Sequence, residues 1–207
     1  MNSKVVLPFC YFPPIGWWVN ALARPNVILD PFEFHIKQSY RSRCKIYSVH
    51  GPQVLTVVTD NNGSKTPMNK TTLVSYEPWR KVHFKALESA YKSSPYFEFF
   101  DKELESIISG DYNSLDELNW RTIEWVNSTL NLNINFKKAT EFIIDYKCLD
   151  YRPGKRNEFI DTELLPKYNQ VFSDKGLPFE PNLSILDLIL NLGMEARPYL
   201  TQIVSKI

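Results

Sequence analysis

Hydrophobic positions follow a strand-like pattern in the first third of the chain and a helical pattern afterwards. Short apolar runs at 4–9 and 26–30 are typical of buried strands. Two alternating runs on either side of a Gly-Pro pair predict a β-hairpin over about 43–59, and the run at 71–76 is compatible with one more strand. This part of the chain therefore favours a sheet.

The pattern becomes helical at Pro78, which suits the first turn of a helix. The positions that then recur at helical spacing are Trp79, Val82, His83, Ala86, Leu87, Ala90 and Tyr91. Ser94 and Pro95 are expected to cap and open a second helix. Its predicted core positions are Phe97, Phe100, Leu104, Ile107 and Ile108.

Capping residues mark two further helices. Ser114 and Glu117 have the spacing of a capping box, and Ser184 with Asp187 repeats that spacing at the start of the apolar stretch "SILDLILNLG". Gly193 at the end of this stretch fits a C-terminal stop. The helical part of the protein is therefore expected to extend to the end of this stretch.

Composition is that of a globular protein, with 43% hydrophobic and 23% charged residues in 207. We expect one α/β domain over 1–207, with a mixed sheet built mainly from the N-terminal third, a short strand within 142–151 and packed helices after about residue 78. No apolar run approaches the roughly 20 residues of a membrane-spanning helix, and no signal-peptide pattern follows Lys4. The sequence therefore predicts a cytoplasmic protein that does not insert into a membrane.

Charge and motif content exclude several functions. Lys and Arg number 24 against 23 Asp and Glu, so no global field attracts nucleic acid, and a single-strand nucleic-acid binder is disfavoured. The chain has no GxGxxG, GxxxxGK[ST], GxSxG or HExxH motif. Its three histidines and three cysteines are too scattered for a metal site. No cofactor and no metal are therefore expected.

A basic segment at residues 37–45 is the first candidate binding region. Lys37, Arg41, Arg43 and Lys45 fall within it without one acidic residue. An extended conformation would place these four side chains on one side, where guanidinium groups suit phosphate or carboxylate. The alternative is an exposed edge strand kept soluble by its cations.

An aromatic segment at residues 10–18, "CYFPPIGWW", is the second candidate. Pro13 and Pro14 predict an extended or turned backbone from Tyr11 to Pro14, so the segment is expected to be a loop that presents its rings. Tyr11 or Trp17 would then cover the flat face of a base or sugar beside the basic segment. The alternative is a loop whose rings pack onto the core.

Two histidines are candidates for a general base. His83 shares an apolar helical face with Trp79, for which a buried, hydrogen-bonded histidine is the commoner outcome. A neutral imidazole beside a pocket would nevertheless be the best proton acceptor that the chain offers. His35, just before the basic segment, is the second candidate.

Six blocks of the chain follow one another in a recognisable order and spacing: "YFPPIGWW", "LDPFEFHIKQSYRSRCKI", "VLTVV", "WRKVHFKALESAYKSSPYFEFF", "LDELN" and "YNQVF" with "FEPNLSILDLILNLG". The closing block is the most specific, because its pattern F-x-P-x-L-S-I-L-D-L-x-x-N-x-G is long. In this order and spacing the blocks resemble the WbqC-like protein family over nearly the whole length of the chain. The chain departs from the family in having Leu7 before Pro8, where Gln is frequent, and Ser42 where Asn is common.

The resemblance implies a bacterial role in surface polysaccharide or O-antigen biosynthesis. It suggests an enzyme, or an enzyme partner, that transfers an acyl or aminoacyl group to a nucleotide-linked amino sugar. The alternative is a non-catalytic binding module for a phosphate-bearing ligand such as a nucleotide sugar. Structural roles compete at some positions, where Asp187 would cap a helix, Trp79 and Tyr96 would pack, and Asn191 would bond the backbone. The positions that match family motifs are Tyr11, Lys37, Gln38, Arg41, Arg43, Trp79, His83, Tyr96, Tyr168, Gln170, Asp187 and Asn191.

Overall fold

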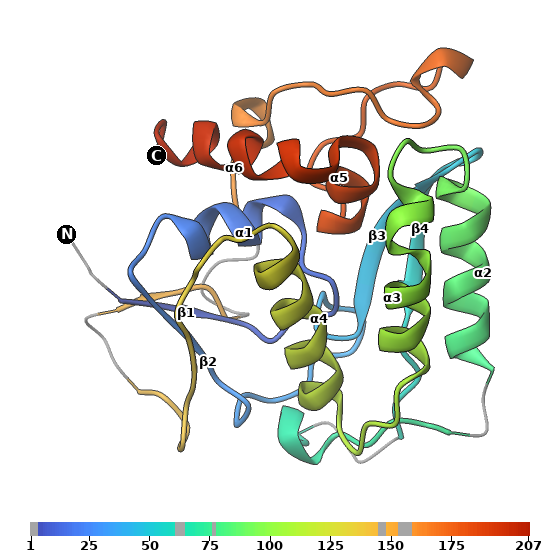
Figure 1. The fold of residues 1–207 in the computed structure, drawn as a ribbon. Helices are drawn as coiled ribbons and strands as arrows, with labels where there is room; N and C mark the ends of the chain where they lie inside the picture. Colours follow the sequence, from blue (N-terminus) through green and yellow to red (C-terminus); the bar gives the residue numbers. More distant parts are fainter. Residues whose placement is uncertain (1–3, 61–64, 76–77, 145–147, 153–158) are drawn as a thin grey trace.

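The computed structural model describes residues 4–60, 65–75, 78–144, 148–152 and 159–207. Its first layer is a four-stranded sheet in the order β5-β2-β1-β6, in which each neighbouring pair is parallel (Figure 1). The strands are β1 (Lys4–Leu7), β2 (Asn26–Leu29), β5 (Phe136–Lys138) and β6 (Leu149–Asp150). The α/β class predicted from the sequence is confirmed.

Helix α1 (Ile15–Leu22) connects β1 to β2 and corrects the expectation for the aromatic segment. Only its first residues are extended or bent, as predicted, and the two tryptophans lie in the helix with fully buried side chains. Pro13 and Pro14 precede the helix, where their missing N–H groups leave no intrahelical bond unmade, so they begin the helix instead of preventing it. Trp17 also donates a hydrogen bond from Nε1 to the Pro8 carbonyl at 3.0 Å.

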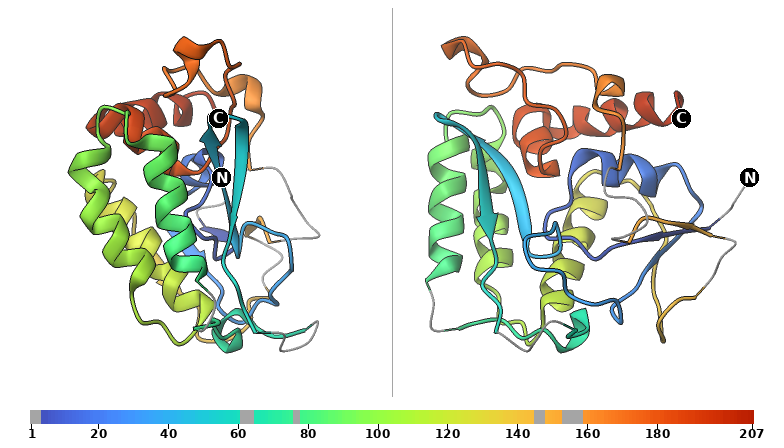
Figure 2. Two further views of the ribbon diagram at one scale, coloured as in Figure 1. Left: turned by 90° about the vertical axis from the view of Figure 1, so that its right-hand side faces the viewer. Right: turned by 180° about the vertical axis from the view of Figure 1, so that it is seen from behind.

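The predicted hairpin is present as β3 (Arg43–Ser48) and β4 (Gly51–Thr56), which form a separate two-stranded antiparallel sheet. Cys44, Ile46 and Leu55 are buried, whereas Arg43 and Lys45 alternate with them on the other face. Helices α2 (Trp79–Tyr91) and α3 (Phe97–Ser109) run along one side of the hairpin (Figure 2). The helical cover expected over the hairpin is therefore confirmed.

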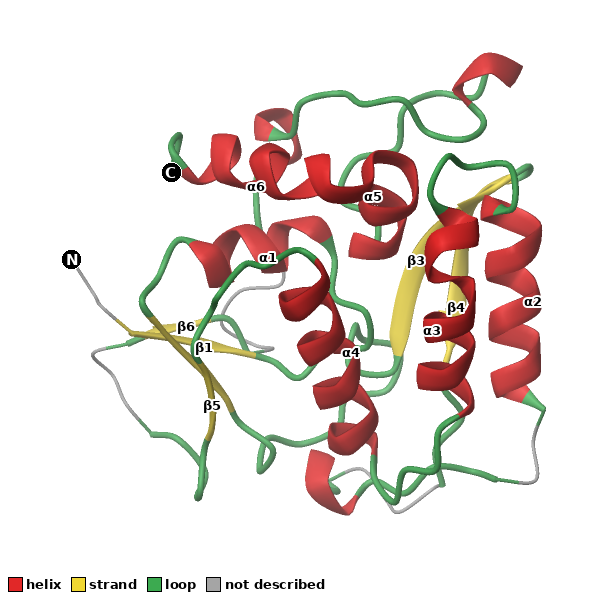
Figure 3. Cartoon of the chain, viewed as in Figure 1, coloured by secondary structure: helices red, strands yellow, loops and turns green. Residues whose placement is uncertain are grey.

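The remaining helices are α4 (Leu115–Thr129), α5 (Ile185–Leu192) and α6 (Ala196–Val204), and Figure 3 shows α5 and α6 lying together beside α1. The α5 cap is confirmed in part, because the Ser184 hydroxyl accepts a hydrogen bond from the Leu186 N–H at 3.3 Å. Asp187 does not cap and lies in the core instead. The predicted Ser94 cap is wrong, since α3 begins later and the Ser94 hydroxyl has no partner among the described residues.

Two other local expectations are corrected. Ser114 is the N-cap residue of α4, but the predicted capping box does not form, because the Ser114 hydroxyl donates to Asp116 and Glu117 accepts from the Asn113 N–H instead of the Ser114 N–H. The run at 71–76, as far as it is described, makes isolated bridges from Thr72 and Leu73 and no strand. Isolated bridges form there because the partners of these residues lie in two different segments.

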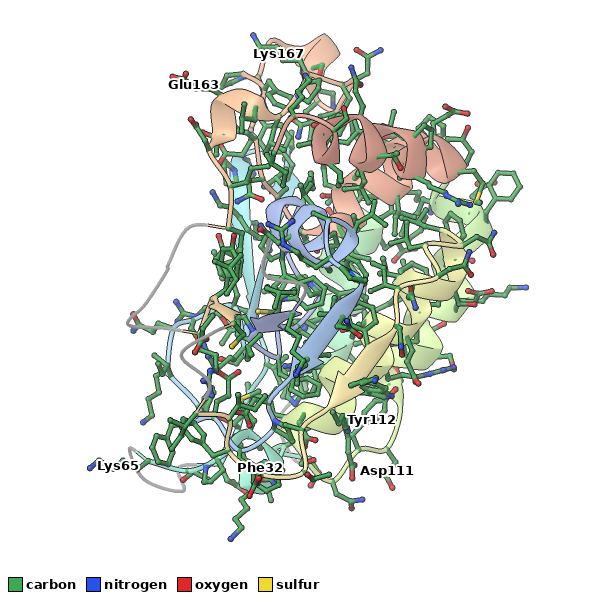
Figure 4. All side chains as sticks on the ribbon, turned by 90° about the vertical axis from the view of Figure 1, so that its left-hand side faces the viewer. Phe32, Lys65, Asp111, Tyr112, Glu163 and Lys167 are labelled. Atoms are coloured by element: carbon green, nitrogen blue, oxygen red, sulfur yellow. The ribbon has the colours of Figure 1, made fainter. Side chains whose placement is uncertain are left out.

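Side chains from α1, the sheet and α4 fill the interior without a break (Figure 4). In that view Glu163 and Lys167 mark one end of the molecule, and Phe32 and Lys65 mark the opposite end. On α4, Asn119 is fully buried and its amide donates to the carbonyls of Phe9 and Arg41, at 3.1 and 2.8 Å. This side chain therefore joins the chain that leaves β1 to the basic segment.

Candidate functional site

The parallel sheet has a switch point beside β1. The chain passes from β1 to β2 on one side, and β6 pairs with β1 on the other side. In open α/β sheets, ligands bind outside the carboxyl ends of the strands at such a point. Pro8 and Cys10 follow β1, Tyr151 follows β6, and all three line a pocket of about 440 Å³.

The basic segment lines the other side of this pocket. It is not extended throughout, because the strand begins only at Arg43 and Gln38 has a φ of 64°. The segment nevertheless brings its cations to one place. The residues that it and its neighbours contribute are Ile36, Lys37, Gln38, Ser39, Tyr40, Arg41, Arg43, Cys44 and Lys45, with Val54 from β4 and Phe159 from the later chain.

Arg41 is almost completely buried, with 2% of its surface exposed, although it lines the pocket. Its Nη2 donates to the carboxylate of Glu33, which is 3% exposed and also accepts a hydrogen bond from the Phe9 N–H at 3.0 Å. Burial raises the pKa of Glu33 to about 7, and the guanidinium of Arg41 opposes that shift. The Nε of Arg41 has no acceptor among the described residues.

Arg43 and Lys45 complete the cationic side. The Nε of Arg43 is also buried without an acceptor in the described part of the chain. The Nζ of Lys45 lies 2.6 Å from Oε1 of Glu180, and this pair is about one third exposed. The two arginines therefore offer donors that an anion could satisfy, whereas Lys45 already has an acidic partner.

Aromatic side chains form a third side of the pocket. The Phe159 ring lies 5.9 Å from the Tyr40 ring and 6.0 Å from the Tyr151 ring, and the latter pair is stacked. The Tyr151 hydroxyl donates to Asn20 at 2.6 Å, which orients the ring. Tyr11 and Trp17, proposed from the sequence for this role, do not line the pocket because both are buried in the core.

A second group of buried charges lies at the same end of the sheet. Arg152, just after β6, donates to Asp30 at 2.6 Å and to Asp150 at 2.7 Å. Asp30 follows β2 directly and is fully buried. Sequence reasoning missed this group, although Asp30 ends the short apolar run at 26–30.

Comparison with known proteins shows the family of this chain. The family model described as the WbqC-like protein family matches residues 10–152. The chain belongs to the WbqC-like family. A Mycobacterium tuberculosis (strain ATCC 25618 / H37Rv) protein named "Uncharacterized protein Rv1507c" is 24% identical over 231 aligned residues, which cover 97% of this chain and 98% of that protein. No solved structure matches the chain.

The positions assigned to family motifs from the sequence separate into several places in the structure. Lys37, Gln38, Arg41 and Arg43 lie together in the pocket. Tyr168, Gln170 and Asp187 form a second, largely buried group, in which the Asp187 carboxylate accepts from both and from the Tyr91 hydroxyl. Burial raises the pKa of Asp187, and these three neutral donors oppose the shift.

The remaining motif positions contact the core. Asn191 donates from Nδ2 to the Asp187 carbonyl at 2.7 Å, and Trp79 donates from Nε1 to the Val74 carbonyl at 2.9 Å. The Tyr96 ring lies against Gly193, where an added Cβ would come within 2.5 Å of it. These contacts are the packing and backbone roles that the sequence left open.

His83 lies in the core between α2 and β4 and does not line the pocket. Its Nε2 is 3.0 Å from the Thr56 carbonyl, which can only accept, so Nε2 carries the proton. Its Nδ1 is 3.2 Å from the Tyr11 hydroxyl, which therefore donates. Burial lowers the pKa of His83 to about 4, and the imidazole is neutral with both nitrogens paired.

His35 directly precedes the pocket-lining residue Ile36 in the chain. Its Nε2 is 3.2 Å from the hydroxyl of Ser42, which stands between the lining residues Arg41 and Arg43. Burial, with the nearby charges of Arg41 and Lys37, lowers its pKa. Of the two candidate histidines, His35 is therefore the one whose neighbours in the chain line the pocket.

Among the described residues, no group of three or more His, Cys, Asp and Glu side chains is arranged to hold a metal ion. The described helices also include none that is long and apolar enough to cross a membrane.

Proposed function

We propose that the pocket binds a phosphate-bearing ligand of the nucleotide-sugar type, and that the protein serves in surface polysaccharide biosynthesis. The observation that carries this proposal is the pair of pocket arginines, Arg41 and Arg43, whose buried Nε–H groups lack acceptors in the described structure. A buried donor without an acceptor costs about 1–3 kcal/mol, which a bound phosphate oxygen would relieve.

The other sides of the pocket support the same ligand class. The rings of Tyr40, Tyr151 and Phe159 offer apolar surface for a flat base or a sugar face. The pocket lies at the sheet end where α/β proteins commonly hold nucleotides. A volume of about 440 Å³ is in the usual range for a small-molecule site.

In the catalytic form of the proposal, an acyl or aminoacyl group is transferred to the amine of a nucleotide-linked amino sugar. The amine attacks the acyl carbon of a thioester or ester donor and forms the new C–N bond. The bond from that carbon to the donor's sulfur or oxygen breaks, so the thiol or alcohol leaves, and the amine proton passes to a base, for which His35, next to the lining residue Ile36, is the candidate.

A second candidate function is a binding module without catalysis. It is favoured by the state of the two pocket thiols, Cys10 and Cys44, which are at most 1% exposed. Burial raises the pKa of both well above the usual range, so neither is a thiolate nucleophile at neutral pH. Turnover of an amino-sugar substrate with an acyl donor separates this function from the first.

Binding is tested by calorimetric titration with UDP-N-acetylglucosamine. Arg43→Ala should weaken binding by roughly 1.5 to 3 kcal/mol, because a charge-assisted hydrogen bond is lost. Arg197→Ala removes the same charge from an exposed position on α6 and serves as the matched control. An equal loss in both variants, or no effect of Arg43→Ala, would contradict the proposed site.

A further inference from the structure

Glu33 and Arg41 form a buried ion pair at the pocket. Arg41 lines the pocket, and Glu33 does not. The two side chains are 2% and 4% exposed. The remaining contact of the Glu33 carboxylate that the structure gives is with the Phe9 N–H, on the chain that leaves β1. Glu33 therefore holds Arg41 in place from the protein side, and the ligand would approach Arg41 from the pocket side.

We infer that Glu33 is the positioning residue of Arg41 and that it takes up a proton when an anion binds there. The inference rests on the proposed function and adds a coupled proton to it. When an anion binds at Arg41, one proton binds with it, and that proton goes to the ionised Glu33 carboxylate.

The physical reason is competition for one guanidinium. Arg41 stays charged in a protein, and in the apo state Glu33, which is about half ionised at pH 7, partly balances that charge. A phosphate oxygen at Arg41 places a second negative charge in the same water-poor region. Like charges raise the pKa of a carboxyl, so protonation of Glu33 relieves the repulsion. Protonated Glu33 keeps a carbonyl oxygen as an acceptor, so the position of Arg41 is retained.

The other titratable and charged groups that face Glu33 do not prevent it from taking up a proton. They come from the ends of three strands and are Cys10 after β1, Asp30 after β2 and Arg152 after β6. Asp30 and Arg152 already pair with each other at 2.6 Å. Cys10 is a neutral thiol because burial raises its pKa. Asp30 adds to the raised pKa of Glu33, which lies at about 7 before any ligand arrives.

His35 is the histidine closest in sequence to the Glu33–Arg41 pair. Its own titration does not overlap with the proton uptake measured at pH 7. Its pKa is lowered from the usual 6.5, so it stays neutral above that pH. A proton taken up near pH 7 is therefore assigned to Glu33, and the variant below tests that assignment.

The test is calorimetric titration of the wild-type protein at pH 7 with two probes, UDP-N-acetylglucosamine and sulfate. Neither probe changes its phosphate or sulfate charge near this pH. Each is titrated in two buffers of different ionisation enthalpy, which yields the number of protons taken up. We expect up to about half a proton per ligand, because Glu33 with a pKa of about 7 is half protonated beforehand. Affinity should increase up to about tenfold between pH 8 and pH 6.

Two variants complete the experiment. Glu33→Gln should bind with no proton uptake and with little pH dependence. Glu180→Gln is the matched control, because it removes the acid from another pocket cation, Lys45, and should retain the uptake. Should Glu33→Gln fail to fold, His35→Gln decides the question, because it removes the other titratable side chain beside Arg41 and should retain the uptake if the proton goes to Glu33.

The outcomes separate the two proposals. Binding without proton uptake overturns the inference and leaves the proposed function intact. Sulfate binding with uptake, but no binding of the nucleotide sugar, supports the inference and overturns the proposed ligand. Absence of binding by both probes overturns both.

Discussion

Neutral, buried His83 should make the protein less stable in acid, and the size of the effect can be worked out. His83 is 3% exposed, and burial lowers its pKa to about 4. In the unfolded chain a histidine has a pKa of about 6.5. Between these values the unfolded state binds more protons than the folded state, so stability falls as the pH falls through this window.

The magnitude follows from the two pKa values. A shift from about 6.5 to about 4 corresponds to about 3 kcal/mol of free energy of unfolding, lost fully only below pH 4. Between pH 8 and pH 5 the expected loss is about 2 kcal/mol.

Other buried groups act in the opposite direction, so a variant is needed to isolate His83. Burial raises the pKa of Glu33 and of Asp187, so the folded protein binds their protons more readily and is stabilised by them as the pH falls. His83→Gln keeps an N–H donor for the Thr56 carbonyl and cannot titrate. The difference between wild type and this variant therefore reports the histidine alone.

The assay is urea unfolding followed by circular dichroism at pH values from about 5 to 8. Relative to His83→Gln, the wild-type protein should lose about 2 kcal/mol across this range. His50→Gln, an exposed change in the hairpin turn, is the control and should leave the shape of the wild-type profile unaltered. Parallel profiles for wild type and His83→Gln would refute the reasoning.

Two further substitutions test packing and hydrogen bonding. Gly193→Ala should lower the melting temperature strongly, because its φ is 57° and the new Cβ would lie 2.5 Å from the Tyr96 ring. Gly176→Ala is the control, because its φ is 77° but open space surrounds it, so it should cost only about 1–2 kcal/mol of backbone strain. Similar losses of stability in the two variants would contradict the role of the Tyr96 contact. Asp187→Asn should destabilise by about 1–3 kcal/mol in denaturant unfolding, since its amide turns an acceptor of Tyr and Gln donors into a donor. An Asp187→Asn protein as stable as wild type would show that the hydrogen bonds of this buried cluster add nothing to stability.

Local signals predicted the hairpin, α2 and the capping serine of α5, because turn residues, helical spacing and caps act within a few residues. The 3-residue strand β5 had no such signal and exists through pairing with β2, more than 100 residues away. The tryptophans of the aromatic segment were placed in a loop because the prolines were interpreted as breaking a helix that they in fact precede.

Only the cationic side of the candidate site was predicted from the sequence. The cations of the basic segment were identified because they are contiguous in the sequence. The aromatic side was not, because Tyr151 and Phe159 reach the pocket only after β6 joins the sheet. The pairing of Arg152 with Asp30 crosses 122 residues, and no spacing rule indicates it.

The amide of Asn119 has a practical consequence for protein engineering. Asn119 does not itself line the pocket, yet it fixes the separation between the exit of β1 and the basic segment through the backbone carbonyls of Phe9 and Arg41. Libraries that aim to change ligand preference can therefore vary exposed lining residues such as Ile36 and Lys37 while Asn119 is held constant. Randomising Asn119 would alter the width of the site and the ligand preference together. A gain in binding found by selection could then not be assigned to either change.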